Sequence, residues 1–322
     1  MKKFIAACLI GASALLLHAE SSQPQTMLSD ILKAALDEIG SEYGRNFTVV
    51  FGNFTFGESG IAGPFSRYLQ DQLSEAVLES PLFDLVVLNA LDNLDPAFEK
   101  AFGSVFKAEQ ASALIRGNYT EVTGQVVVDL EVISLTDGTL IGKKKVMIDK
   151  TLIPAREALL PDNYGKALAV GQAIADVLPA QPADFSVKVS TNRGNGGVYR
   201  DGEELTISFF SSRDAYVKLY HIDVNGATKL IFPNQYHKDN FIRAGTMTVI
   251  PDQSYTFRFV LGPPFGTEYI KVIASTEPFT EVETSFEGLG PASRGLLTRG
   301  LTVTSKRGST AEALLSYTIM EK

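Results

Sequence analysis

The sequence has little of the side-chain chemistry that supports catalysis. Cys8 is the only cysteine among its 322 residues, and it lies inside an apolar amino-terminal run. Without that run the chain has no cysteine, which excludes disulfide bonds and thiol chemistry. His221 and His237 are then the two remaining histidines. A zinc site built on them would need carboxylates as further ligands, and no such spacing occurs, so we expect no metal site.

Two further motifs are absent or incomplete. The sequence contains no Gly-x-Ser-x-Gly elbow that would present a nucleophilic serine. The glycine-rich segment Asn192–Gly197 is not followed by Lys-Ser/Thr or by a helix start, both of which a phosphate-binding loop needs. We interpret it as a flexible connection between strands. No catalytic residue and no cofactor is therefore predicted, and we expect that the protein is not an enzyme.

The amino terminus predicts export. Lys2 and Lys3 precede the uncharged apolar run Phe4–Leu17, and Ala19 follows. This layout is typical of a secretory signal peptide, with cleavage expected after Ala19. A lipoprotein cysteine stands at the cleavage site, and Cys8 does not. We expect a periplasmic or outer-membrane-associated protein.

The mature chain is acidic and has no second long apolar run. Loss of the two lysines lowers the basic residues from 29 to 27 against 37 acidic ones, which leaves a net charge of −10. This charge disfavours binding to nucleic acid or to anionic lipid. No remaining apolar stretch approaches the roughly 20 residues that span a bilayer, so we expect no transmembrane segment.

The first half alternates helical and strand patterns. Helical spacing begins at Leu28, and Gly40 is expected to end that helix. Pro64 favours the start of a second helix, and Asp95–Pro96 the start of a third. Between and after them lie apolar segments typical of strands: 47–54, 83–88, 113–122, 125–134 and 139–149. With a last helix at about 162–177, this order predicts an α/β domain on a mixed sheet.

The second half changes to strands alone. Residues 179–183, Pro-Ala-Gln-Pro-Ala, are expected to form an interdomain linker. Alternating apolar residues then recur at 205–209, 255–261, 270–274 and 315–319, and Asn225–Gly226 is a hairpin signal. Short strands at this spacing indicate a β-sandwich. The predicted fold class is therefore α+β, with an α/β domain over 20–178 and an all-β sandwich over 184–322.

The second half also resembles a known family. Strand-like Asp201–Phe209 is followed by Tyr220–Gly226 and Leu230–Asn234, and then by Gly262–Glu268 and Val272–Ser275. This succession resembles the bacterial domain of unknown function 4384 over about residues 184–322. The resemblance implies a β-rich extracytoplasmic module and supplies no catalytic set.

The first half resembles a second group. The strand Val49–Phe54, the helix with Tyr68–Leu69, the segment Phe83–Val87 and the segment Ala113–Tyr119 precede the turn Leu135–Gly138. This pattern is similar to the amino-terminal α/β domain of TolB and to CsgG-like envelope proteins, including the FlgO-like group. The similarity implies an assembly or accessory role at the cell envelope.

We therefore expect an exported, non-enzymatic envelope protein that acts by binding, with an envelope protein of unknown identity as partner. The polar loop 234–241 is the expected contact, through Tyr236, His237, Asp239 and Phe241, because it mixes aromatic and polar side chains. One alternative is an envelope glycan hydrolase, which would show an acidic pair across a deep pocket. Another is a small-ligand-binding module on the β-sandwich, which would show an apolar pocket rimmed by aromatic side chains.

Overall fold

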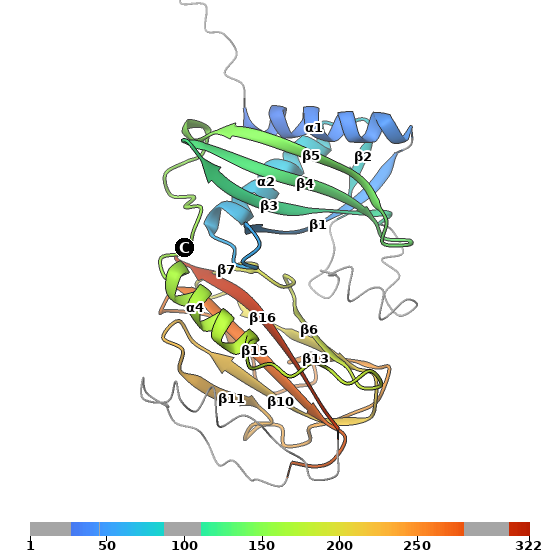
Figure 1. Ribbon diagram of the computed structural model, residues 1–322, viewed down its shortest axis with the longest axis vertical. Coiled ribbons are helices and arrows are strands. Elements are labelled where there is room, and N and C mark those ends of the chain that lie inside the picture. Colours follow the sequence, from blue (N-terminus) through green and yellow to red (C-terminus); the bar gives the residue numbers. More distant parts are fainter. Residues whose placement is uncertain (1–26, 45, 87–110, 280–308) are drawn as a thin grey trace, which may run out of the picture.

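A computed structural model of the chain describes residues 27–44, 46–86, 111–279 and 309–322. Its elements form two bodies that lie one above the other along the long axis (Figure 1). The predicted signal peptide at 1–19 and the helix predicted to start at Asp95–Pro96 lie outside the described residues.

The first body is a five-stranded mixed sheet with two helices. Its elements are α1 (Leu28–Tyr43), β1 (Phe47–Phe56), α2 (Pro64–Leu78), β2 (Phe83–Leu85), β3 (Ala113–Val122), β4 (Gln125–Ser134) and β5 (Leu140–Asp149). The strand order is β2-β1-β3-β4-β5. Strand β1 runs parallel to β2 and β3, whereas β3-β4 and β4-β5 are antiparallel hairpins. The predicted mixed sheet is confirmed.

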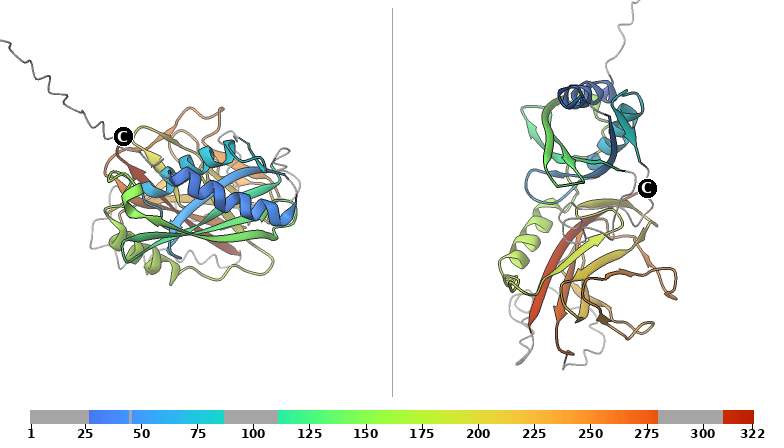
Figure 2. Two further views of the ribbon diagram at one scale, coloured as in Figure 1. Left: turned by 90° about the horizontal axis from the view of Figure 1, so that it is seen from above. Right: turned by 90° about the vertical axis from the view of Figure 1, so that its right-hand side faces the viewer.

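Both helices cover the same face of this sheet. Leu32 and Leu36 of α1 and Phe65 and Leu69 of α2 are fully buried in one apolar cluster with the inward side chains of β1, β3, β4 and β5. The sheet curls around the helices, which Figure 2 shows in its right-hand view. The opposite face of β1, β3 and β4 points away from both helices.

Helix α1 does not end at Gly40 as the sequence predicts. It continues to Tyr43, and Gly44 ends it in the left-handed conformation, with φ 64°. Gly40 is instead a point of close contact, since a Cβ there would lie 2.9 Å from the Phe83 ring and 3.0 Å from Leu82. The residue type at Gly40 is thus set by helix–strand packing, which a local pattern does not contain.

The second body contains most of the strands. Its elements are α4 (Tyr164–Ala175), β6 (Val187–Thr191), β7 (Gly197–Arg200), β8 (Glu204–Leu205), β9 (Ile207–Ser211), β10 (Ala215–Ile222), β11 (Thr228–Phe232), β12 (Phe241–Ile242), β13 (Met247–Ile250), β14 (Phe259–Val260), β15 (Gly266–Ser275) and β16 (Thr310–Met320). A short 3-10 helix, η1 (Lys150–Leu152), begins the connection from the first body.

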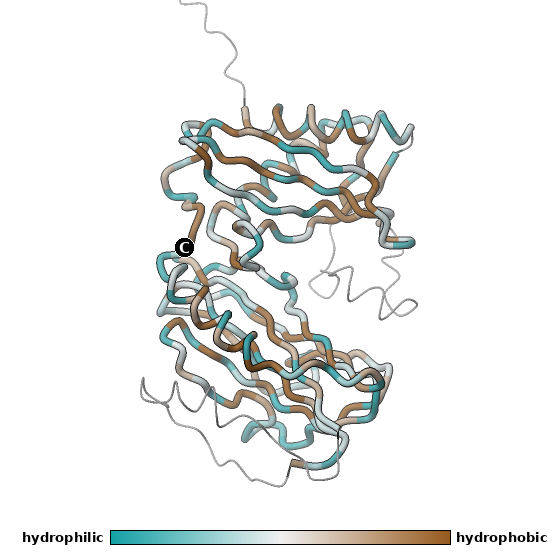
Figure 3. The backbone as a smooth tube through the Cα atoms, in the orientation of Figure 1, coloured by the Kyte–Doolittle hydropathy of each residue, from teal (hydrophilic) through white to brown (hydrophobic). Residues whose placement is uncertain are grey.

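Two sheets of the second body share one buried cluster. The larger has the order β11-β10-β15-β16-β7, with β12 paired to β10, and the smaller has the order β13-β9-β6. Ile207 and Phe209 of the small sheet are buried in the same cluster as Leu219 and Val272 of the large one. Hydropathy alternates along the strands, and the turns are mostly hydrophilic (Figure 3). The predicted α+β class with a β-rich second half is confirmed.

The predicted strand at 255–261 is largely irregular. Only Phe259 and Val260 pair with another strand, β8. Tyr255, Phe257 and Phe259 are half-buried at the border of the second cluster, whereas the pattern predicts Phe257 and Phe259 in the core. Alternation of apolar and polar residues indicates which side chains lie on the same face of a strand. It does not indicate how completely other residues cover that face.

Helix α4 and the predicted linker both pack on the second body. The Tyr269 hydroxyl of β15 donates to the Ala167 carbonyl of α4 at 2.7 Å. The Gln181 side chain bonds to both backbone groups of Val187 and to the Glu312 carbonyl. The domain limits, including the linker at 179–183, stay a prediction, and these contacts show only which elements pack together. They place α4 with the second body.

Candidate functional site

The four predicted contact residues lie in two groups. Tyr236 and His237 belong to one ring cluster, in which the Tyr236 ring stacks on Phe257 at 6.0 Å and the His237 ring lies 4.6 Å from Tyr255. Phe241 instead packs edge-on against Tyr216, 5.2 Å away, where β12 pairs with β10. The loop therefore presents two separate aromatic contacts.

The first group continues into a row of rings that we call the aromatic surface, made of Tyr236, His237, Tyr255, Phe257 and Phe259. The Tyr255 and Phe257 rings meet at 5.4 Å, and Phe257 and Phe259 at 5.3 Å. His237 stacks on Phe232, which is buried in the second core. Tyr236 is 62% exposed at the outer end of the row. The row thus joins an exposed ring to the core.

Asp239 contributes charge to this surface. Its Oδ1 accepts a hydrogen bond from the Phe241 N–H at 3.1 Å. The pKa of the Tyr255 phenol is raised, first by burial and then by the negative charges of Asp252 and Asp239. Negative charge thus lies beside the rings, together with the positive charge of Arg258, whose guanidinium donates to the Tyr255 carbonyl at 3.0 Å and to the Phe257 carbonyl at 2.8 Å.

His221 lies in the interior of the larger sheet of the second body. It lies on β10, which is flanked by β11 and β15. Its Nε2 lies 2.7 Å from Oε2 of Glu268, which is 4% exposed and also accepts a hydrogen bond from the Tyr317 hydroxyl at 2.7 Å. Burial, followed by the Glu268 charge, raises the pKa of Tyr317. Both partners satisfy a buried carboxylate, which indicates a structural role for His221.

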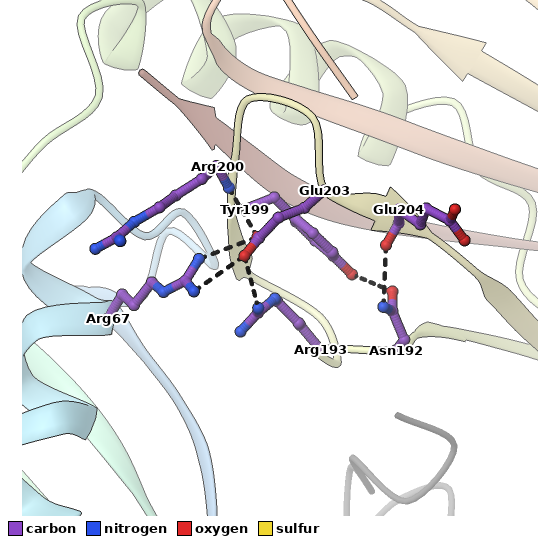
Figure 4. Close-up of polar contacts among 7 residues, drawn as sticks. All are labelled: Arg67, Asn192, Arg193, Tyr199, Arg200, Glu203 and Glu204. Atoms are coloured by element: carbon purple, nitrogen blue, oxygen red, sulfur yellow. Dashed lines mark hydrogen bonds and ion pairs between the residues drawn. The ribbon is translucent and has the colours of Figure 1, made fainter. Parts of the chain in front are cut away.

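A carboxylate clamp joins the two bodies, and Figure 4 shows it. The Arg67 guanidinium of α2 donates two 3.0 Å bonds to Glu203, in the turn before β8. Arg193 donates a third bond at 3.1 Å, and the Arg200 N–H donates a fourth at 2.8 Å. Burial opposes ionisation of Glu203, but these donors outweigh it, so its pKa is lowered. Burial and the nearby Arg67 charge lower the pKa of Arg193.

The contact between the two bodies around Arg67, Arg193 and Glu203 is called the seam below. The glycine-rich segment Asn192–Gly197 belongs to it. The Asn53 amide of β1 donates to the Arg193 carbonyl and, at 3.0 Å, to the Asn195 carbonyl. The Asn195 side chain accepts from the Ser316 N–H at 2.9 Å. The segment does connect β6 and β7, but these bonds hold it against the first body, which corrects its interpretation as a flexible connection.

Two cavities lie on either side of the loop Gly57–Gly60 that follows β1. The larger, of about 560 Å³, is lined by Phe56 and Glu58 from the first body and by Tyr164, Leu168 and Tyr269 from the second. The smaller, of about 310 Å³, adjoins the seam and is lined by polar and apolar groups alike, and the polar ones include Asn53, Arg116, Glu131 and Arg193. Both combine side chains from the two bodies.

The smaller cavity contains the residue type that the glycan-hydrolase alternative requires. Glu58 and Glu131 are the two carboxylates among its lining residues. Glu131 is engaged by the Lys143 ammonium at 3.0 Å and by Arg116 at 3.7 Å. These ion pairs lie on the outer face of β3, β4 and β5, and in this structure they engage the Glu131 carboxylate.

Two features are absent from the described residues, which have gaps at 1–26, 45, 87–110 and 280–308. No group of three or more His, Cys, Asp or Glu side chains in this part of the chain could hold a metal ion. No helix of the same part is long and apolar enough to cross a membrane.

The sequence did not predict the seam or three of the five residues of the aromatic surface, Tyr255, Phe257 and Phe259. Arg67 and Glu203 are 136 residues apart, and no local pattern links them. Tyr255 and Phe257 were assigned to a strand because they alternate with polar residues. The available signal was the proline and glycine content on both sides of 255–261, which argues against a regular strand.

The comparisons with known proteins match part of the chain. A family model described as a domain of unknown function, DUF4384, matches residues 198–278, which are 81 of the 322 residues. This match confirms the predicted resemblance for that segment. The similarity of the first half to TolB, CsgG-like and FlgO-like proteins stays a prediction. A search of the curated proteins finds no match.

Several solved structures share a weak likeness with the chain. The LpoB C-terminal domain from Escherichia coli aligns at 11% identity and TM-score 0.25, over 36% of this chain and 97% of that one. The LpoB C-terminal domain from Salmonella enterica aligns at 14% identity and TM-score 0.28, over 37% of this chain and 98% of that one. An NMR structure of E. coli LpoB aligns at 10% identity and TM-score 0.24, over 46% of this chain and 83% of that one. At TM-scores this low, the likeness carries no argument about this chain, and residues 198–278 remain similar to a family whose description names no activity.

Proposed function

We propose that the mature chain is an exported, non-enzymatic protein of the bacterial cell envelope that acts by binding a protein partner. Export rests on the leader at 1–19, and a periplasmic or outer-membrane-associated site follows from it. In this proposal the aromatic surface makes the contact, with Phe241 as a second contact beside it.

One observation carries the proposal. Tyr236 is 62% exposed although its ring rests on Phe257, and the row behind it reaches the buried Phe232. Single exposed rings are common on monomers, but a contiguous row is not. Aromatic anchors that are held in place before binding lose little conformational entropy, which is why they carry much of the energy of protein interfaces.

The test uses a photo-crosslinking amino acid at position 236 in the full-length precursor, produced in its own host. A crosslinked envelope protein is expected, and its identity allows affinity to be measured with purified proteins. Tyr236→Ala combined with Phe241→Ala should then weaken binding at least about tenfold, with little change in melting temperature. Tyr43→Ala, which removes an exposed ring of α1 in the first body, should leave affinity unchanged.

Two results would contradict the proposal. Equal affinity of the double variant and the native protein would remove the aromatic surface from the contact. Cleavage of envelope glycan by the purified protein would overturn the non-enzymatic role. The mass of the chain recovered from the envelope checks export separately, and we expect it to begin at Glu20 without acyl groups.

A further inference from the structure

We propose that the larger seam cavity is a binding site for a small organic cation with an apolar body. The cavity of about 560 Å³ lies within the range of small-molecule sites, and it combines apolar walls with few polar groups. This inference is independent of the aromatic surface, which lies on other elements of the second body.

The walls of the cavity suit an aromatic or aliphatic group. The Phe56 ring of β1 meets the Tyr164 ring of α4 edge-on at 5.6 Å, so the two bodies contact each other through aromatic side chains at this point. Tyr269, Leu168 and Leu314 add apolar surface from α4, β15 and β16.

Helix α4 can lie against β15 here because residue 171 is glycine. A Cβ at Gly171 would stand 2.5 Å from the Tyr269 hydroxyl. The Tyr269 hydroxyl is already bonded to Ala167, and burial raises the pKa of that phenol to about 12. Tyr269 therefore serves as a neutral wall of the cavity.

Glu58 determines the charge of the ligand. Apart from the phenols of Tyr164 and Tyr269, it is the one acidic or basic side chain among the residues that line this cavity. It is exposed, and within the described residues its carboxylate has no ion pair. A carboxylate beside aromatic faces favours a cation, since both the charge and the ring quadrupoles attract it.

Polar groups without charge complete the rim. Gln172 of α4, Asn195 and Ser316 line the cavity next to Glu58. Asn195 and Ser316 are fixed by the bonds of the seam, including the 2.7 Å bond from the Ser316 hydroxyl to the Gly60 carbonyl. Because the walls come from both bodies, an occupied cavity would fasten the bodies together.

The test uses tryptamine as the cationic probe, with tryptophol and indole-3-acetate as neutral and anionic probes of similar shape. The chain contains no tryptophan, so the fluorescence anisotropy of the indole reports binding to the mature protein directly. Tryptamine is expected to bind at least tenfold more tightly than tryptophol, and indole-3-acetate more weakly still. The preference should fall as salt screens the charge.

Matched variants locate the site. Glu58→Gln should abolish the preference for tryptamine, whereas Glu42→Gln, an exposed acid of α1, should retain it. Ala175→Phe, which adds a ring to a lining position of α4, should weaken tryptamine binding at least tenfold. Ala173→Phe, at an exposed α4 position outside the lining, should not.

The proposal would be overturned by equal affinity for the three probes, by preference for the anion, or by no anisotropy change at millimolar concentrations. It would also be overturned if Glu58→Gln kept the preference or if Ala175→Phe bound tryptamine as the native protein does. Melting temperatures of the four variants, expected to match the native value, check that each is folded.

Discussion

In the described residues, the core of the first body is nearly free of acidic and basic side chains, whereas the second body buries four of them. Among the described residues of the first body, Glu157 alone is a buried acid or base, at the border of burial and paired with Arg156. Among the described residues of the second body, the buried acidic and basic side chains are Lys218, Glu268, Lys271 and Glu312.

The difference follows from how each sheet is covered. The outer face of β3, β4 and β5 in the first body carries exposed ion pairs, such as Lys143–Glu131 and Lys145–Asp129. All ten residues of β15 are buried, so the side chains on both of its faces are removed from water. A strand covered on both faces must pair every polar side chain internally, which makes the second body depend on specific partners.

The largest expected change in the free energy of unfolding concerns Lys271 of the second body. Its ammonium lies 2.7 Å from the Glu312 carboxylate, and both side chains are buried. Lys271→Met leaves an unpaired buried charge and should lower the free energy of unfolding by about 3–5 kcal/mol. Adding Glu312→Leu should restore most of it, since an apolar pair needs no partner. Urea unfolding of the three proteins measures both values, and a single variant as stable as the native protein would contradict the argument.

The second prediction concerns where the two bodies divide. Residues 161–322 produced alone keep α4, whereas residues 184–322 expose Tyr269, Ile222 and Leu314, which α4 covers. Because each buried apolar side chain contributes about 1.5–3 kcal/mol, the longer fragment should be more stable by at least about 3 kcal/mol. Thermal unfolding compares the two, and equal stability would favour the boundary at 179–183.

The third prediction compares one buried tyrosine in each body. The Tyr119 hydroxyl donates to the Leu159 carbonyl at 2.7 Å and accepts from the Gly63 N–H at 2.9 Å. Tyr119→Phe leaves both backbone groups without a partner and should cost about 1–3 kcal/mol.

Tyr199→Phe is the matched change in the second body. The Tyr199 hydroxyl contacts the side chains of Thr191 and Asn192, which can turn to other partners. Its cost should therefore be smaller, at about 1 kcal/mol or less. Chemical denaturation of both variants tests the order, and the reverse order would show that backbone partners are not the deciding factor.

The smallest expected effect is the acid response of the seam. Because the pKa of Glu203 is lowered in the folded protein, its contribution is present above the ordinary value of 4.5 and is lost as the pH falls through the folded pKa. Hydrogen exchange at the Arg200 amide, which donates to Glu203, should therefore accelerate beyond its intrinsic rate as the pH falls below 4.5 and through the lowered pKa of Glu203.

Two neighbouring variants separate this effect from general acid unfolding. Glu203→Gln should show fast exchange at Arg200 already at neutral pH, with little further change in acid. Glu204→Gln removes an exposed acid that pairs with Arg258 within the second body, and it should behave like the native protein. The same pH profile in both variants would show that Glu203 does not control the seam.

Local sequence determined the elements of this protein. Pro64 marks the start of α2, and the turns at Thr136–Gly138 and Asn225–Gly226 join the antiparallel pairs β4-β5 and β10-β11. The limits of β3 and β4 coincide with the predicted ranges 113–122 and 125–134. Periodicity and turn chemistry act between residues a few positions apart, so a single sequence is enough to read them.

Tertiary structure alone decided which surfaces meet. The clamp of Arg67 and Glu203, the cavity walls from Phe56 and Tyr164, and the helix continuing through Gly40 all depend on contacts between distant segments. The four predicted contact residues include Tyr236 and His237 of the aromatic surface, but its depth depends on Tyr255 and Phe257. Burial is a property of what covers a side chain, and here the covering groups come from other strands and loops of the folded chain.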